Sequence, residues 1–597
     1  MARIKSLLAA LTVLVVCPCR PAPASETPPP PPAAAPGAPV PALKAESSAP
    51  TRAALERLGT VAIQDGGRVM PLEGYARRLA AKVTGREKWG AGRGPAAYSG
   101  RTPMELLADA MFRGQALLHE PLVGIENRPF KEKVGLDPQR KFFSPVEIAA
   151  CQGINAVLGE FATARQHDPQ ASPNKDQRMA LDIRDAVERV AALASGEPLA
   201  IVPAGPDRPF LRAAAGAGRG DPGAASVSSA VAALGQAYTS GADINGAVDG
   251  VIAAVSASGE MEPRDARAVR LELFYDRHQP WRQTSLLYGL SIVLFGLSRL
   301  MLRRALVALA IVAALAGVAE HLLGIGLRVA ILGRAPVSNT YEALLWMGLV
   351  GIGIGGVAQL MNRQAWYLFG GVAAAFVCGL FAGMMPLEDQ TNSLPAVLRS
   401  NFWLIIHVLT IVASYGVLAV ASVLGHVYLA KEVLLARRGG VFTAEAPKRS
   451  APLIVQTYRT IQVGLFLLTA GTILGGVWAA ESWGRFWGWD PKETWALISI
   501  LVYLAVLHAR HIRWLMDFGL AAAAVLGFVV IVWTFYGVNY VMASGLHSYG
   551  FGSGGEVWVG LWAAAELAFL SACRVRYVAL KRRPRGGAVS PRGAAAV

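Results

Sequence analysis

Long apolar runs fill the second half of the chain and indicate its fold class. After Trp281 they recur at residues 283–301, 305–326, 340–361, 365–385, 402–430, 460–480, 494–511, 516–541 and 556–574. Each run approaches or exceeds the ~20 residues that a helix needs to cross the hydrocarbon core of a bilayer. Short segments with charged residues, glycine and proline separate the runs. This pattern predicts an all-α polytopic membrane fold with roughly nine transmembrane helices.

Residues 51–280 show a different pattern, in which shorter apolar stretches recur with the period of a helix. Four of these stretches predict helices at Pro103–Phe112, Ser144–Arg165, Arg178–Ala194 and Ser226–Thr239. Glycine and proline are frequent at residues 203–222 and interrupt the pattern there. We therefore expect a mostly helical domain that lies outside the bilayer.

The N-terminus has the pattern of a secretory signal peptide. Arg3 and Lys5 precede the apolar stretch Leu7–Val16, and the small residues Ala22 and Ala24 suit cleavage by a signal peptidase. Residues 25–50 are rich in proline and alanine, which favours an extended linker. The expected organisation is a signal peptide at 1–24, a linker at 25–50, an exported mostly helical domain at 51–280, a membrane domain at 281–576 and a basic cytoplasmic tail at 577–597.

The placement of charge predicts how the membrane domain is oriented. The chain holds 57 Lys and Arg against 41 Asp and Glu, and the basic residues gather between apolar runs and at the C-terminus. They form no basic stripe on a soluble domain, so nucleic-acid binding is not expected. By the positive-inside rule the basic loops face the cytoplasm, which agrees with export of the N-terminal domain. We expect a multi-pass membrane protein with four loops on the outer face, at Leu327–Asn339, Met385–Asn401, Glu481–Glu493 and Ala543–Gly555.

Cysteine chemistry has little support in the sequence. The five cysteines are Cys17, Cys19, Cys151, Cys378 and Cys573, and they include no CxxC pair in the expected mature chain. This spacing argues against a thioredoxin-like redox role and against a cysteine-based zinc site.

One short segment is unusually rich in tryptophan. The segment Trp483–Trp495, here named the tryptophan segment, contains Trp483, Trp487, Trp489 and Trp495. An aromatic belt at a membrane surface needs only one or two rings at each helix end. Gly484 and Gly488 lie among the rings, and glycine lets a backbone approach a flat ligand closely. Because broad indole faces suit a large planar hydrophobic ligand, we expect these rings and the turn at Asp490 to form a ligand platform.

Two histidines are expected on the same face of the membrane as the tryptophan segment. His407 lies at the outer end of its apolar run, behind Trp403, and His547 lies in the loop Ala543–Gly555. Ionisable side chains in or near a bilayer are costly and are usually functional. Two imidazoles that flank an aromatic platform are a common means of holding haem iron. The residues therefore predict a haem b site with His407 and His547 as the iron ligands.

A third histidine, His508, lies near the cytoplasmic end of its apolar run. It predicts a second, deeper haem position for which one iron ligand is identified. The companion ligand is either His426, at a similar depth on another run, or a residue of another protein.

Several runs of residues resemble one known family. The run Trp483-Gly-Arg-Phe-Trp-Gly-Trp-Asp-Pro-Lys-Glu-Thr-Trp-Ala496 is similar to the WWD signature of the CcsA/ResC proteins of System II cytochrome c biogenesis. Further matches occur in family order at Gly333–Glu342, Trp403–Val408, Phe535–Asn539 and Gly545–Tyr549. The run Pro491–Trp495 differs from its counterpart in the related haem-handling proteins of System I. The resemblance extends over about residues 283–575.

The resemblance implies a role in attaching haem to cytochrome c. CcsA proteins work with a CcsB/ResB membrane partner, receive haem inside, and offer it outside to the CxxCH motif of an apocytochrome c. His407 and His547 would be the outer ligands and His508 an inner ligand, with a companion histidine supplied by the CcsB partner. The chain would then be the haem-ligating subunit of a cytochrome c synthase. The alternative is a haem transporter or chaperone without ligation activity.

Overall fold

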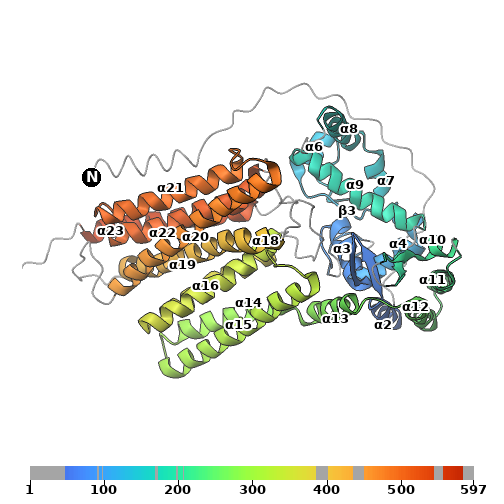
Figure 1. The fold of residues 1–597 in the computed structure, drawn as a ribbon, viewed down its shortest axis with the longest axis horizontal. Helices are drawn as coiled ribbons and strands as arrows, with labels where there is room; N and C mark the ends of the chain where they lie inside the picture. The colour runs from blue at the N-terminus through green and yellow to red at the C-terminus, as the bar shows by residue number, and fades with distance from the viewer. Residues whose placement is uncertain are drawn as a thin grey trace, which may run out of the picture. The chain divides into compact units, whose positions relative to one another are not determined.

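The computed structural model describes residues 48–90, 93–96, 98–168, 173–196, 199–205, 208–218, 220–384, 401–434, 450–542 and 556–581. They form a helical N-terminal region followed by a bundle of long apolar helices (Figure 1). The expected signal peptide, most of the linker and most of the basic tail lie outside the described residues, and so does His547.

Short helices and small antiparallel sheets build the N-terminal region. The helices are α2 (Ala49–Leu58), α3 (Leu72–Thr84), α4 (Pro103–Phe112), α5 (Gly114–Leu117), α6 (Arg128–Val134), α7 (Pro145–Ala150), α8 (Gln152–His167), α9 (Lys175–Ala194), α10 (Ala213–Gly218), α11 (Pro222–Ser240), α12 (Asn245–Ser258) and α13 (Pro263–His278). The strands pair as β1 (Ala62–Asp65) with β2 (Arg68–Pro71), β3 (Val123–Gly124) with β4 (Phe142–Phe143), and β5 (Ala200–Val202) with β6 (Leu211–Arg212).

Local sequence explains where several of these helices begin. Reciprocal capping boxes start α4, α7 and α9, and they pair Thr102 with Glu105, Ser144 with Glu147, and Asn174 with Gln177. Each box satisfies two backbone N–H groups that have no partner inside the helix. The helix expected at Pro103–Phe112 has the bounds of α4. The one expected at Ser144–Arg165 is two helices, because the extended backbone of Cys151 separates α7 from α8.

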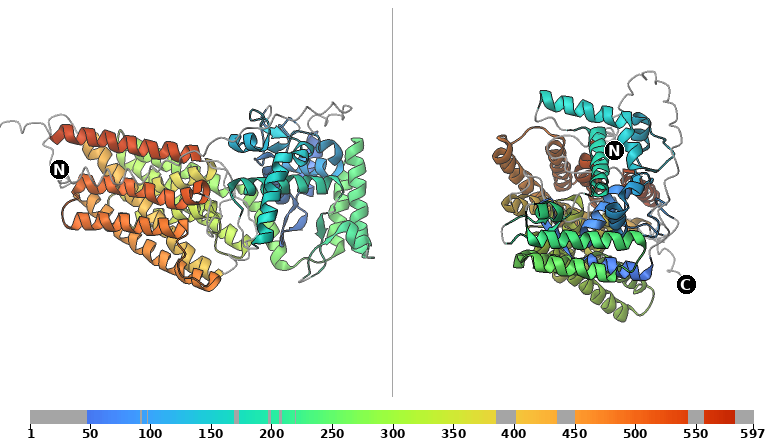
Figure 2. Two further views of the ribbon diagram at one scale, coloured as in Figure 1. Left: turned by 90° about the horizontal axis from the view of Figure 1, so that it is seen from above. Right: turned by 90° about the vertical axis from the view of Figure 1, so that its right-hand side faces the viewer.

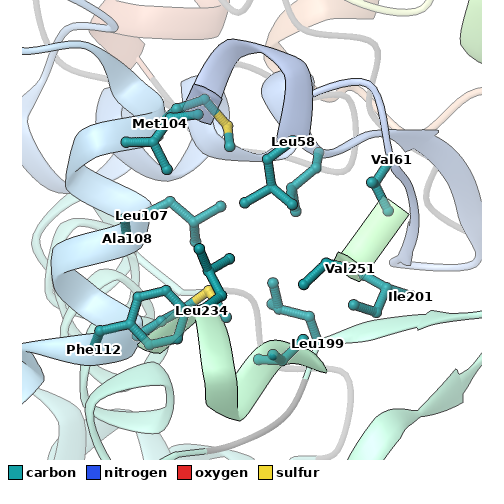
Figure 3. Close-up of a pocket in the computed structure, with 14 residues that line it drawn as sticks. Leu58, Val61, Met104, Leu107, Ala108, Phe112, Leu199, Ile201, Leu234 and Val251 are labelled. Carbon is teal, nitrogen blue, oxygen red and sulfur yellow. The ribbon is translucent and has the colours of Figure 1, made fainter. Parts of the chain in front are cut away.

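Apolar side chains from α2, α4, α11 and α12 pack into the core of this region and enclose a small cavity (Figure 3). Leu58, Met104, Leu234 and Val251 are among the residues that line it, and all its lining residues are apolar. Its volume of about 20 Å³ is close to that of one water molecule. An apolar gap of this size is a packing defect rather than a ligand site.

The second part of the chain is a bundle of long helices, in which η denotes a π-helix. The elements are α14 (Pro280–Leu297), α15 (Arg303–Leu332), α16 (Thr340–Asn362), α17 (Trp366–Met384), α18 (Asn401–Trp403), η2 (Leu404–Val408), α19 (Leu409–Leu429), η3 (Ala430–Leu434), α20 (Ala451–Trp483), α21 (Pro491–His511), α22 (Asp517–Val532), η4 (Trp533–Met542) and α23 (Glu556–Lys581). Figure 2 shows these helices running alongside one another.

The bundle confirms the expected all-α polytopic membrane fold. Within the described ranges, eight helices are long and apolar enough to cross a membrane. The first expected run corresponds to α14, which packs against α15 and α17 but is not among the eight. The total of nine spans therefore stays a prediction.

Small residues let the helices of the bundle pack closely. A side chain on Gly355 of α16 would lie 2.6 Å from the carbonyl oxygen of Tyr367 on α17. One on Gly371 of α17 would lie 2.6 Å from the carbonyl oxygen of Gly351 on α16. Close approach of this kind is typical of membrane helices, whose association gains nothing from excluding water. Helix α19 contacts α16, α17, α20 and α22, and it therefore lies at the centre of the bundle.

A buried arginine, which is ion-paired within the bundle, also contacts the last helix of the N-terminal region. Arg328 on α15 is fully buried and donates hydrogen bonds to Glu342 on α16, with an Nη2–Oε1 distance of 2.8 Å. Its Nη1 also donates to the hydroxyl of Tyr275 on α13, at 3.0 Å. Because a buried charge is tolerated only when it is paired, this network fixes the ends of α15 and α16 against α13.

Candidate functional site

The backbone of the tryptophan segment is a short connection between two helices. Helix α20 ends at Trp483, and Gly484 closes it in the left-handed conformation with φ of 69°. Asp490 then caps α21, where its carboxylate accepts hydrogen bonds from the backbone N–H groups of Lys492 and Glu493. Pro491 occupies the first turn, where its missing N–H has no consequence. The expected turn at Asp490 is therefore the start of a helix.

Glu493 is the residue around which this connection folds. Its Oε2 accepts hydrogen bonds from the backbone N–H of Gly488 at 2.7 Å and of Asp490 at 3.3 Å. Its Oε1 lies 3.7 Å from Nη1 of Arg485. A side chain on Gly488 would overlap the Arg485 guanidinium. The room at Gly488, which the sequence suggested was for a ligand, is thus taken up by Arg485.

The four tryptophan rings take part in three separate contacts. Trp487 and Trp489 meet edge to face, with ring centroids 5.9 Å apart. Trp495 meets Trp533 of η4 at 5.8 Å. The guanidinium of Arg485 lies over the ring of Trp483, 6.0 Å from its centroid. The rings are therefore distributed from the end of α20 to the first turns of α21, where Trp495 contacts η4.

Trp489 combines exposure with backbone strain. Its side chain is 69% exposed, and its φ of 57° is in the left-handed region that bulky residues rarely adopt. This conformation costs about 1–2 kcal/mol for a residue with a Cβ. Strain of this kind clusters at binding and active sites, where surrounding structure maintains it. Here the cap of α21 and the hydrogen bonds of Glu493 hold the backbone on either side of the ring.

His407 lies within the π-helix η2 and contacts α20. The Nδ1–H donates a 2.8 Å hydrogen bond to the carbonyl oxygen of Gly471, and the ring meets Trp478 at 5.7 Å. One turn earlier, Nε1–H of Trp403 donates to the Glu481 carboxylate at 2.6 Å. The structure thus brings His407 to the helix that leads into the tryptophan segment. A π-helix at this position agrees with the frequent occurrence of such turns at functional sites.

Hydrogen bonds also connect the tryptophan segment to η4. The Nζ of Lys492 donates to Oδ1 of Asn539 at 2.8 Å. Further along the same helices, the hydroxyls of Ser499 and Thr534 are 2.8 Å apart. The chain continues from η4 into residues 543–555, which include His547 and lie outside the described residues.

The remaining histidines of the bundle differ in how their rings are used. His508 is exposed, and its Nδ1 bonds the carbonyl oxygen of Leu504, one turn earlier. His426 has both ring nitrogens engaged, by the carbonyl oxygen of Ser422 at 2.9 Å and by Glu566 of α23 at 2.7 Å. In this arrangement both ring nitrogens of His426 are engaged by protein groups.

One larger cavity lies among α14, α15, α16 and α17. Its volume is about 230 Å³, and Trp281, Tyr288 and His321 line it. His321 is buried, with its ring nitrogens bonded to the hydroxyl of Tyr288 and to the carbonyl oxygen of Leu345. No residue of the tryptophan segment lines this cavity.

Sequence reasoning missed four residues that shape the site, namely Glu481, Lys492, Glu493 and Asn539. Glu493 has a local signal, because an acidic residue three positions after the cap Asp490 is the spacing of a capping box. The role of Asn539 depends on a partner that is distant in sequence, and no local pattern indicates it.

Comparison with known proteins identifies the family. Residues 337–547 match the family model described as cytochrome C assembly protein. The cytochrome c biogenesis protein CcsA of Synechococcus sp. (strain CC9902) is 40% identical over 246 residues, which are 36% of this chain and 79% of that relative. CcsA of Guillardia theta is 37% identical over 240 residues, which cover 36% and 77% of the two chains. Protein NrfI of Wolinella succinogenes is 39% identical over 245 residues, 39% of this chain but only 25% of NrfI. The chain therefore belongs to the CcsA family of cytochrome c biogenesis proteins, as a multi-pass membrane protein.

Proposed function

We propose that this protein binds haem b at the tryptophan segment, with His407 and His547 as iron ligands, on the periplasmic face of a bacterial inner membrane. It presents the haem for covalent attachment to the CxxCH motif of apocytochrome c, together with a CcsB/ResB-type membrane partner. The observation that carries the proposal is the position of His407, which lies against α20 just ahead of the tryptophan segment. The run of tryptophans and the family membership support haem as the ligand.

The described side chains suit a porphyrin. The hydrogen bond from Nδ1–H of His407 to Gly471 selects the tautomer in which Nε2 carries the lone pair used for iron ligation. The exposed ring of Trp489 and its neighbour Trp487 offer apolar faces for a flat macrocycle. Together these groups can hold both the metal and the ring of one ligand.

The contribution of this chain to the reaction is positioning. Haem supplies the vinyl groups that take up the cysteine thiols of the apocytochrome. His407 and His547 fix the iron, the tryptophan rings fix the plane of the macrocycle, and the exposed site leaves an edge open to the incoming CxxCH. The histidine of that motif then replaces one of the protein imidazoles. Holding the haem vinyl groups and the cysteine thiols in a reactive orientation lowers the barrier, and no further catalytic group is required.

On this proposal, His508 is an iron ligand of a second haem position near the inner side of the membrane. Its ring is exposed on the surface of α21, and its Nδ1 bond to Leu504 leaves Nε2 as the ligating nitrogen. Because the ring nitrogens of His426 are engaged by Ser422 and Glu566, the companion ligand comes from the CcsB-type partner.

The test uses the purified full-length protein. We expect it to carry b-type haem, with an absorption spectrum that changes in His407→Ala and in His547→Ala. An unchanged spectrum and haem content in both variants would contradict the assignment of the ligands. Covalent attachment of haem to an apocytochrome, measured with and without the CcsB-type partner, then separates a synthase subunit from a protein that only holds haem.

A further inference from the structure

Lys492 lies at an unusual position for a cation. It is in the first turn of α21, where the helix dipole already places partial positive charge. A lysine there is unfavourable by a few tenths of a kcal/mol or more unless it has a negative partner. The carboxylate of Asp490 lends a nearby negative charge, but its hydrogen bonds to this turn go to the backbone N–H groups of Lys492 and Glu493 rather than to the ammonium.

The ammonium of Lys492 has one hydrogen-bond acceptor in the part of the chain that the structure describes. That acceptor is Oδ1 of Asn539, a neutral amide, at 2.8 Å. An ammonium carries three N–H donors, so two donors remain for another ligand. The other cation of the tryptophan segment, Arg485, is paired with Glu493 and lies over Trp483. Among the described residues, Lys492 is therefore the cation of this segment whose side chain forms no ion pair with a carboxylate.

We propose that Lys492 binds a propionate carboxylate of haem, and that Asn539 positions its ammonium for this contact. The proposal rests on the proposed function, because it names the group that recognises one edge of the same ligand. Haem is an apolar plane with two carboxylates on one edge, and a carboxylate close to a bilayer needs a cationic or hydrogen-bonding partner. Indole faces accommodate the plane, whereas Lys492 supplies the charge.

Asn539 restricts where the ammonium of Lys492 can lie. It is buried on η4, and its amide oxygen holds Nζ of Lys492 between α21 and η4. A lysine side chain has four rotatable bonds, so a fixed acceptor at its tip limits the positions that the ammonium can take. Trp495 and Trp533 meet edge to face between the same two helices, which places aromatic rings along the same contact.

The experiment compares two porphyrins on the full-length protein. Haem and its dimethyl ester have the same ring and iron, but the ester lacks both negative charges. Binding of each is titrated spectroscopically to the apoprotein in detergent, and the ratio of the two dissociation constants is recorded. We expect wild type to bind haem about tenfold or more tightly than the ester, the range for a charge-assisted hydrogen bond.

The variants test which residue carries that preference. Lys492→Met is expected to bring the ratio close to one, Lys492→Arg to retain most of it, and Asn539→Leu to reduce it. Lys431→Met, a lysine on η3 that is paired with Glu432, is the matched control and keeps the wild-type ratio. Because the ratio is measured within one protein, partial loss of folded material does not change it.

The outcomes separate the two proposals. A wild-type protein that binds neither porphyrin contradicts the proposed function itself. A wild-type protein that binds haem and its ester equally, or a Lys492→Met variant that keeps the preference, contradicts the role of Lys492 and leaves the haem site standing.

Discussion

A side chain on Gly475 of α20 would lie 2.7 Å from Cε1 of His407, so the imidazole occupies space that only glycine leaves open. Gly471, Gly475 and Trp478 follow one another at helical spacing and lie on the same face of α20. For His407, Gly471 provides the hydrogen-bond acceptor, Gly475 leaves space for the ring, and Trp478 provides an aromatic contact. The orientation of His407 is therefore built into the helix that leads to the tryptophan segment.

Gly475→Ala should displace the imidazole of His407. Overpacking at a filled position costs about 1–3 kcal/mol, and here the ring moves more easily than the helix backbone. We expect several-fold lower haem content and an altered absorption spectrum. Gly353→Ala on α16, where a side chain would meet nothing within 4 Å, is the control and should leave both unchanged. An unaltered spectrum in Gly475→Ala would show that His407 is not an iron ligand in this orientation.

Trp489→Gly should separate ligand binding from stability. Glycine adopts positive φ without penalty, so the substitution relieves about 1–2 kcal/mol of strain while removing the exposed ring. We expect the thermal stability to be equal or higher and haem binding to be weaker. Trp514→Ala removes an indole that is similarly exposed just beyond the other end of α21 and should not affect binding. Wild-type affinity in Trp489→Gly would argue against this ring as part of the haem platform.

His426→Ala should weaken the bundle but keep the inner haem. His426 bonds Glu566 and stacks on Phe569, so its loss leaves a carboxylate of α23 without its partner. In protein co-purified with the CcsB-type partner, we expect the haem-to-protein ratio to fall in His508→Ala and not in His426→Ala. A double-mutant cycle with Glu566→Gln measures the coupling of the pair. Loss of the inner haem in His426→Ala would instead make His426 the ligand within this chain.

The features that could be predicted from the sequence, such as the membrane helices, depend on residues that are close together in the chain. Apolar runs longer than a bilayer core indicate membrane helices because unpaired backbone groups are not tolerated in lipid. The crowding of indoles between two such runs indicated the tryptophan segment, whose role as a ligand site stays a prediction. The use of each group depends on tertiary contacts that no local pattern records. Gly488 makes room for Arg485, Asn539 meets Lys492 across 47 residues, and the π-helical turn at His407 packs against α20.

The N-terminal region should respond to pH through Asp276. This carboxylate lies on α13, ahead of the first membrane helix, 3.4 Å from Nη1 of Arg77 on α3. Burial raises the pKa of Asp276 to about 7, and Glu272 is among the acidic groups that add to the rise, against the opposing charge of Arg77. The unfolded carboxyl titrates near its model-compound value of 3.8, so folding favours the protonated form. That stabilisation is complete below about pH 4 and is lost as the pH rises to about 7.

Asp276→Asn tests this linkage directly, because the amide has the shape of the protonated carboxyl and does not titrate. The pKa difference corresponds to about 4 kcal/mol at most, and loss of the contact with Arg77 offsets part of it. Hydrogen-exchange protection of α3 and α13 in the full-length protein should fall between pH 5 and 8 in wild type, after correction for intrinsic rates. The decline should be shallower in Asp276→Asn. Asp249→Asn, at an exposed carboxylate on α12, should keep the wild-type slope. Equal slopes in wild type and Asp276→Asn would mean that the pH dependence arises at other groups.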